Sequence, residues 1–134
     1  MDVMKILCVE HQPDSLEALT CMLEGTGYEV MAATSAGQAL DLLTRNPVDG
    51  VLLEYSLPDA TGIAVRAEMK RIKPDVPVLL FAGVGAQTPS LLRFFDFYVR
   101  SEGRDLQKPS NRRTELASAT GDKVLVLHFC SETR

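Results

Sequence analysis

A carboxylate at the end of a buried strand is the residue of this sequence best placed to do chemistry. Glu54 follows an apolar run, residues 51–53, which is too uniformly apolar for a half-exposed strand and is typical of a central parallel strand. The carboxyl ends of parallel strands open into a shared crevice where α/β proteins place ligands. Glu54 is therefore a candidate functional residue, and the Pro58-Asp59 turn and Gly62 after it lead into a helix.

Other strand ends carry residues that could join Glu54. Glu10 and His11 follow the first apolar run of the chain. Arg100 ends a later run, and its guanidinium could form a bidentate pair with a carboxylate. Such a pair between Glu54 and Arg100 either carries a functional charge or is a simple ion pair with no further role. His11 beside two carboxylates suggests a transition-metal site, but a solvent-facing loop residue explains it as well, and we assign no metal site.

The elements that must position these residues alternate between strand and helix patterns. Short apolar runs predict strands at residues 5–10, 28–32, 50–54 and 76–82. Helical periodicity and caps predict helices that begin near residues 13, 35 and 62; Ser35 and Gln38 form a capping box. This alternation predicts a doubly wound parallel sheet with helices on both faces.

The pattern weakens after the fourth strand. We expect a short helix at residues 90–95, a fifth strand at residues 97–100 and a polar loop at residues 101–122. The apolar run from Lys123 to Phe129 predicts a late strand. That strand must be buried, either as an extra strand of its own sheet or against the edge of another chain, which would make a homodimer.

Composition limits the class of protein. With 134 residues, 46% of them hydrophobic and 24% charged, the chain is expected to fold as a single globular domain. The net charge of −4 argues against a general nucleic-acid surface. No apolar run is long enough for a membrane span or a signal peptide, so we expect a cytoplasmic protein. Cys8, Cys21 and Cys130 lack metal-ligand spacing and are expected to be free; Cys8 and Cys21 are expected in the core.

Four segments taken together resemble the receiver domain of bacterial two-component response regulators. They are ILCVEHQPD, VLLEYSLPDATG, VPVLLFAG and DFYVRS, and the resemblance covers about residues 4 to 101. The run from Glu54 to Gly62 is the most specific part. The resemblance implies a flavodoxin-like fold with a five-stranded parallel sheet. It divides the chain into a receiver-like domain, residues 1–101, and an atypical C-terminal extension, residues 102–134, that completes or extends it.

The resemblance also implies roles for the strand-end residues. Glu54 falls at the phosphoacceptor aspartate, while Glu10 and His11 fall at the acidic pair that holds magnesium in the family. Ala82 falls at the switch hydroxyl and Arg100 at the family's lysine. Every one of these positions departs from the family's residue types. Phe97 falls at the switch aromatic, but we favour packing in the core or an interface, because Ala82 leaves no hydroxyl for the aromatic ring to follow.

These departures favour a receiver that no longer runs the ordinary chemistry. Phosphoryl transfer depends on positioning of the reacting groups. Glutamate extends the carboxylate by one methylene compared with aspartate, and a displacement of about 1 Å can cost on the order of a hundredfold in rate. His11 suits magnesium poorly, and Ala82 removes the switch hydroxyl. We therefore expect a non-enzymatic pseudo-receiver with lost or weak Mg²⁺ binding, no effector domain in this chain, and a histidine kinase or downstream effector as partner. The alternative is a still phosphorylatable or metal-dependent receiver that uses Glu54 in a phosphorelay.

Overall fold

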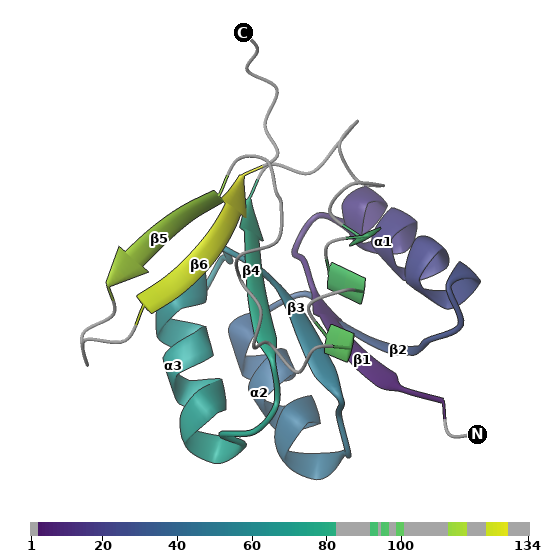
Figure 1. The fold of residues 1–134 in the computed structure, drawn as a ribbon, viewed down its shortest axis with the longest axis horizontal. Coiled ribbons are helices and arrows are strands. Elements are labelled where there is room, and N and C mark those ends of the chain that lie inside the picture. The colour runs from purple at the N-terminus through teal and green to yellow at the C-terminus, as the bar shows by residue number, and fades with distance from the viewer. Residues whose placement is uncertain are drawn as a thin grey trace, which may run out of the picture.

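The computed structural model describes residues 3–82, the pairs 92–93, 95–96 and 99–100, and segments 113–117 and 123–128. Strands and helices alternate through the first of these ranges (Figure 1). The elements are β1 (Lys5–Val9), α1 (Pro13–Gly25), β2 (Glu29–Ala33), α2 (Ala36–Arg45), β3 (Gly50–Glu54), α3 (Gly62–Ile72), β4 (Val78–Ala82), β5 (Arg113–Ala117) and β6 (Lys123–His128).

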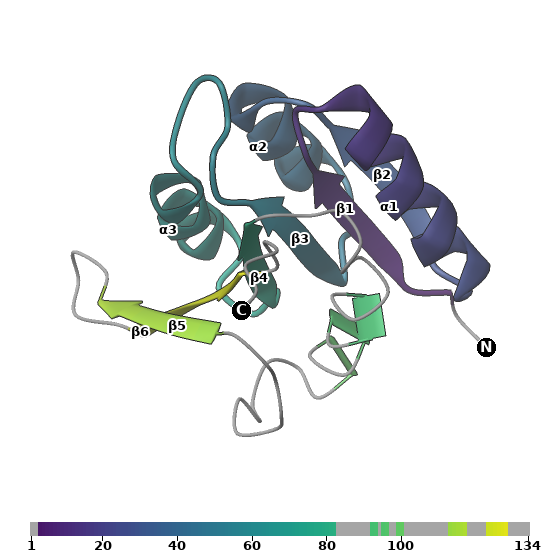
Figure 2. The same cartoon turned by 90° about the horizontal axis from the view of Figure 1, so that it is seen from above.

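The strands form one six-stranded sheet in the order β2-β1-β3-β4-β6-β5. Every neighbouring pair is parallel except the last, since β5 runs antiparallel to β6. The predicted parallel α/β sheet is therefore confirmed, and its first four positions follow the strand order of flavodoxin-like proteins. The expected number of five strands is wrong, because the sheet has six described strands and an antiparallel edge. Helix α1 lies on one face and helices α2 and α3 lie on the other, which is clear when the sheet is seen from above (Figure 2).

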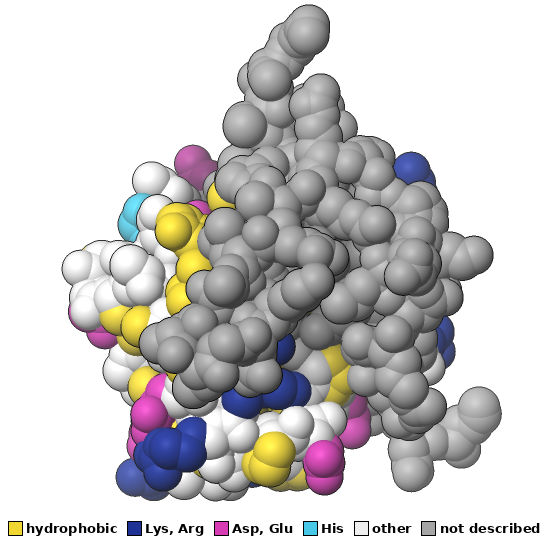
Figure 3. All heavy atoms as spheres, turned by 60° about the vertical axis from the view of Figure 1, so that its left-hand side comes forward, with side chains coloured by type: hydrophobic (Ala, Val, Ile, Leu, Met, Phe, Trp, Pro, Cys, Tyr) yellow, Lys and Arg dark blue, Asp and Glu magenta, His cyan; other side chains and the backbone are white. Residues whose placement is uncertain are grey.

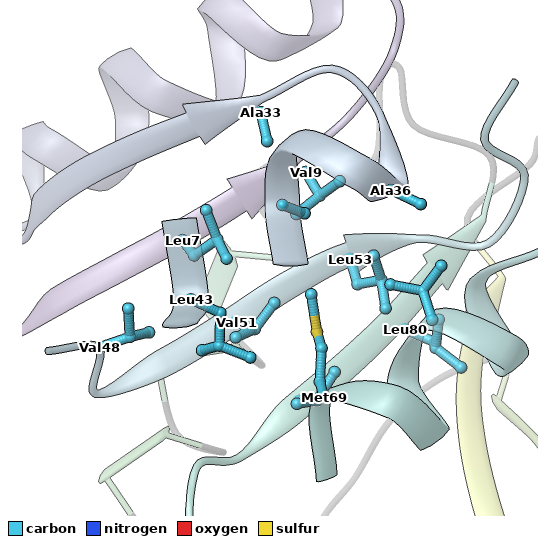
Figure 4. Close-up of a cluster of buried hydrophobic side chains, with 13 residues drawn as sticks. Leu7, Val9, Ala33, Ala36, Leu43, Val48, Val51, Leu53, Met69 and Leu80 are labelled. Atoms are coloured by element: carbon cyan, nitrogen blue, oxygen red, sulfur yellow. The ribbon is translucent and has the colours of Figure 1, made fainter. Parts of the chain in front are cut away.

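The core has one layer on each side of the sheet. On the side of α2 and α3, leucines and valines of the strands pack with Leu43 and Met69 from the helices (Figure 4). On the side of α1, the helix residues Leu19 and Leu23 pack with Phe81. Three residues with helical backbone, Leu92, Phe95 and Val99, complete this second layer. Both faces of the central strands are thus covered, as their uninterrupted apolar runs require.

Helix starts agree with the caps expected from the sequence. The Gln38 amide donates to Ser35 Oγ at 3.2 Å, and Gln38 Oε1 accepts from the Thr34 amide at 2.9 Å. The Thr61 hydroxyl accepts from the Ala64 amide at 3.3 Å and begins α3. These side chains satisfy amides that a helix leaves without partners in its first turn.

Residues 97–100 do not form the fifth strand that we predicted, as far as they are described. Val99 and Arg100 have helical backbone, and Val99 is buried on the α1 side of the sheet. The position beside β4 is taken by β6, so the late strand is confirmed and lies within its own sheet. Both edges of β6 are paired, to β4 and to β5, which is the arrangement expected of an extra strand in its own sheet. The segment that we expected to be a polar loop, residues 101–122, contains strand β5.

One expectation about the cysteines is wrong. Cys8 lies in the core, but Cys21 is exposed on α1, next to Met22, which is 38% exposed. With 3.6 residues per turn, Cys21 lies on the side of α1 opposite to the buried Leu19 and Leu23. Cys130 lies outside the described residues. No helix among the described residues is long and apolar enough to cross a membrane.

Candidate functional site at the carboxyl end of the sheet

Glu54 is the last residue of β3 and lies at the carboxyl edge of the sheet. It is in register with Phe81 of β4, and the Tyr55 amide donates to the Phe81 carbonyl at 2.8 Å. These contacts fix the backbone on both sides of the side chain. The Ser56 amide donates to Glu54 Oε2 at 3.3 Å, so the carboxylate is turned back toward its own loop.

Glu10 is the buried acid of the site. It directly follows β1 and is only 2% exposed, and its amide donates to the Ala33 carbonyl at 3.0 Å. Its Oε2 accepts a hydrogen bond from the Gln12 amide at 2.9 Å. His11 Nδ1 lies 3.6 Å from the same oxygen and has no hydrogen-bond partner among the described residues. The structure thus brings Glu10 and His11 together at the edge where Glu54 lies.

The electrostatics of Glu54 are set by burial and by Glu10. Burial of the carboxyl group, followed by its hydrogen bond to Glu10 and the negative charge of Glu10, raises the pKa of Glu54 to about 8. The amide of Ser56 acts in the opposite direction, since it stabilises the carboxylate, but it is the smallest influence. Two carboxyl groups this close cannot both ionise readily, so near neutral pH the pair retains a proton.

The loop after Glu54 is held by short backbone contacts. The Gly62 amide donates to the Tyr55 carbonyl at 2.5 Å. A Cβ atom at residue 62 would lie 2.7 Å from the Glu54 carbonyl oxygen and 2.8 Å from Tyr55 Cα. Only glycine permits this approach, because backbone atoms of the strand end cannot move aside. The glycine that carried the sequence resemblance therefore closes the loop onto the strand that bears Glu54.

Ala82 ends β4 at the same edge, and it is in register with a residue that the sequence analysis did not consider. His128, the last residue of β6, pairs with Ala82 in the parallel ladder. The signal was present in the sequence, since the apolar run of the late strand ends in histidine. The sequence prediction assigns the fifth strand to residues 97–100 and leaves the place of the late strand open, so it does not include His128 among the strand-end residues.

Arg100 lies elsewhere. Its Nε donates to Asp96 Oδ1 at 2.9 Å, and its guanidinium carbon lies 5.7 Å from the centre of the Tyr28 ring. The Tyr28 hydroxyl donates to the same Asp96 oxygen. Burial and the Asp96 hydrogen bond raise the pKa of Tyr28 above its usual range. The expected pairing of Arg100 with Glu54 is therefore wrong, and Glu54 meets Glu10 instead. Phe97 lies outside the described residues.

The residues present do not fit a magnesium ion. Magnesium prefers several oxygen ligands in octahedral geometry, whereas His11 offers nitrogen at the second acidic position. In the described part of the chain, no three side chains of histidine, cysteine, aspartate or glutamate are placed to hold a metal ion together.

Surface features away from this edge do not add to the site. A groove of about 420 Å³ lies between the C-terminal end of α1 and the helical residues beyond β4, and it is lined by Met22, Thr26, Leu92, Arg93 and Asp96. In the space-filling view, described side chains of both charges are interspersed, with lysines and arginines low on the face shown (Figure 3).

Comparison with known sequences gives a consistent family. A family model described as Response regulator receiver domain matches residues 6–98. Transcriptional regulatory protein GlrR of Escherichia coli (strain K12) is 30% identical over 81 residues, or 60% of this chain and 18% of that protein. Response regulator SaeR of Staphylococcus aureus (strain USA300) is 32% identical over 74 residues, which are 55% of this chain and 32% of that protein. The chain thus spans less than a third of these relatives.

Solved structures agree on the fold. A CheY-like response regulator receiver domain protein from Methanospirillum hungatei JF-1 matches with a TM-score of 0.69 and 19% identity, covering 75% of this chain and 97% of that chain. Response regulator protein TrrA from Thermotoga maritima, crystallised in complex with Mg²⁺-BeF, matches with a TM-score of 0.59 and 26% identity. The match covers 69% of this chain and 80% of that chain.

Proposed function

Because the chain belongs to the response regulator receiver domain family, we propose that it is a pseudo-receiver, a protein-interaction module of two-component signalling that has lost ordinary aspartyl phosphorylation. Receiver domains are typically non-catalytic signalling modules that interact with histidine kinases. We propose a histidine kinase or a downstream effector as partner, in the cytoplasm. The roles of Glu54, Glu10, His11 and Ala82 in this proposal follow from their places at the carboxyl edge of the sheet.

The carrying observation is the contact between the two carboxyl groups. The pKa of Glu54 is raised to about 8 by burial and by Glu10, so near pH 7 most of its population is protonated. A protonated carboxyl group is a poor nucleophile for a phosphoryl group. The glutamate side chain is also one methylene longer than aspartate, which displaces the attacking oxygen from the in-line position.

The remaining positions of the site support the same proposal. Ala82, at the end of β4, has no hydroxyl to turn toward a phosphoryl group. Arg100 is held by Asp96 and Tyr28, so no described cation neutralises Glu54. We propose that Mg²⁺ binding is lost or weak, since His11 replaces an oxygen ligand.

Chemical phosphorylation tests the proposal directly. Incubation of the full chain with acetyl phosphate and Mg²⁺ at pH 7 is expected to leave the intact mass unchanged. A receiver domain with the usual aspartate, treated in parallel, provides the positive control. A gain of one phosphoryl mass on this chain, assigned to Glu54 by peptide mapping, would contradict the proposal.

A second function is favoured by the intact scaffold of the loop. Gly62 still closes onto the strand end, and Glu10 is still buried beside Glu54. The alternative is therefore a receiver that remains phosphorylatable through Glu54. It predicts that phosphorylation of Glu54 rises above pH 8, where Glu54 loses its proton, and an unchanged mass in the same incubation at pH 9 would contradict it.

A further inference from the structure

Asp59 connects two elements that are distant in the sequence. It lies in the loop between β3 and α3, and its carboxylate reaches the start of α2. The Ala36 amide donates to Asp59 Oδ1 at 2.9 Å, and the Gly37 amide donates to Oδ2 at 3.1 Å. These two hydrogen bonds hold the pKa of Asp59 below its usual range. Each carboxylate oxygen thus binds one of the first two amides of the helix.

The rest of the α2 start is capped from within its own segment. Ser35 Oγ accepts from the Gln38 amide, and Gln38 Oε1 accepts from the Thr34 amide. The local capping residues therefore leave the first two amides to a partner from outside. Asp59 fills that place, because a carboxylate is favoured at the positive end of the helix dipole. The contact is a tether between α2 and the loop rather than an ordinary cap.

Short contacts lead from Asp59 back to Glu54. The Leu57 amide donates to the Ala60 carbonyl at 3.2 Å, which closes the turn that carries Asp59 at its tip. Below this turn, Ser56 and Thr61 form an antiparallel bridge. The amide of Ser56 is the group that donates to Glu54 Oε2. The tip, the bridge and the Ser56 amide form one small hairpin, so fixing its tip also fixes the donor that orients Glu54.

We propose that Asp59 is a positioning residue that tethers the Glu54 loop to helix α2 and thereby holds the Glu54 carboxyl in its place beside Glu10. The inference rests on the proposed function of this site. The hairpin is anchored at its base by Gly62 and at its tip by Asp59. Loss of the tip anchor leaves the base intact, and the loop opens locally without unfolding the domain.

The test uses the full chain with Asp59→Ala, which removes both acceptors, and Asp59→Asn, which keeps one. Amide hydrogen exchange reports Ala36, Gly37 and Ser56, and carbodiimide labelling read by mass spectrometry reports access to the Glu54 carboxyl. We expect about tenfold faster exchange at Ala36 and Gly37 in Asp59→Ala. We also expect about threefold faster labelling of Glu54, with intermediate values in Asp59→Asn.

Asp41→Asn is the matched control. Asp41 is an exposed carboxylate on α2 that pairs only with Arg45 among the described residues, so its loss changes the net charge equally. In the Asp41→Asn variant, the rate of carbodiimide labelling at Glu54 is expected to equal that of the wild type. Faster exchange in Asp59→Ala with unchanged exchange at Ser56 and unchanged labelling of Glu54 would overturn the inference and leave Asp59 a simple cap. If Asp59→Ala fails to fold, Asp59→Asn decides by the same measurements.

The outcome is separable from that of the proposed function. Phosphorylation of wild-type Glu54 would contradict the pseudo-receiver proposal but would not change the labelling rates. An unchanged labelling rate would contradict the tether but would say nothing of phosphorylation.

Discussion

At the scale of single residues, the partner of a carboxylate decides its chemistry. The sequence placed Glu54 at a strand end correctly, because an apolar run followed by an acid is a local pattern. It could not show that Glu10, rather than Arg100, lies beside it. That choice depends on where residues 99–100 fold, and helical backbone there takes Arg100 to Asp96 and Tyr28. A guanidinium would have lowered the pKa of Glu54, whereas Glu10 raises it.

The raised pKa of Glu54 predicts a pH dependence of stability. Between the ordinary glutamate pKa of 4.5 and the raised pKa of about 8, the folded chain keeps a proton that the unfolded chain has released. Stability therefore falls as pH rises through this window and is lowest above pH 8. Glu54→Gln removes the dependence, so the variant should gain on the order of 1–2 kcal/mol over wild type at pH 9, a value reduced for the half-exposed side chain.

Urea unfolding at pH 5, 7 and 9 measures this difference. The gain in free energy of unfolding of Glu54→Gln over the wild type should be small at pH 5 and should grow as the pH rises. Glu17→Gln, at an exposed position of α1, is the control and should show no such trend. An equal difference between Glu54→Gln and wild type at all three pH values would contradict the assignment of the proton to the carboxyl pair.

Gly62 gives a second prediction at this scale. Gly62→Ala places a Cβ against the Glu54 carbonyl and Tyr55 Cα, and neither backbone atom can yield. We expect a loss of about 1–3 kcal/mol in the free energy of unfolding. Gly25→Ala, at the end of α1 with no atom within 4 Å of the added carbon, is the control and should be neutral or slightly stabilising. Denaturant midpoints compare the two variants.

At the scale of elements, local patterns predicted most of the first 82 residues and failed where patterns are ambiguous. Caps and periodicity identify α2 because Ser35 and Gln38 act within one turn. Residues 97–99, by contrast, are aromatic and β-branched, a composition that suits a strand or the buried side of a helix. At residues 99–100 the backbone is helical, and Val99 packs against Gly50 of β3.

The fit of Val99 on Gly50 predicts energetic coupling between them. A Cβ atom at residue 50 would lie 2.9 Å from Val99 Cγ2, so Gly50→Ala pushes the helical residues off the sheet and should cost about 1–3 kcal/mol. Val99→Ala removes the clashing methyl groups. In the double variant the loss should be at least about 1 kcal/mol smaller than the sum of the single losses. Additive losses in a double-mutant cycle would show that these residues do not pack together.

At the scale of the whole molecule, the end of the described chain completes the sheet. Strand β6 is paired to β4 on one edge and to β5 on the other, so it carries the sheet beyond the first four strands. The sequence predicted the strand from its apolar run. Its place could not be predicted, since pairing between distant segments depends on the whole fold and leaves no local periodic signal.

Breaking β6 should therefore cost stability without changing the oligomeric mass. Val126 is in register with Leu80 of β4 on one edge and with Thr114 of β5 on the other, so Val126→Pro disrupts this ladder and should lower the free energy of unfolding by about 3 kcal/mol. Val3→Pro, at an exposed residue before β1, is the matched control and should stay within about 0.5 kcal/mol of wild type. Light scattering should give equal masses for all three proteins. A lower mass for Val126→Pro alone, with unchanged stability, would instead show that this strand joins two chains.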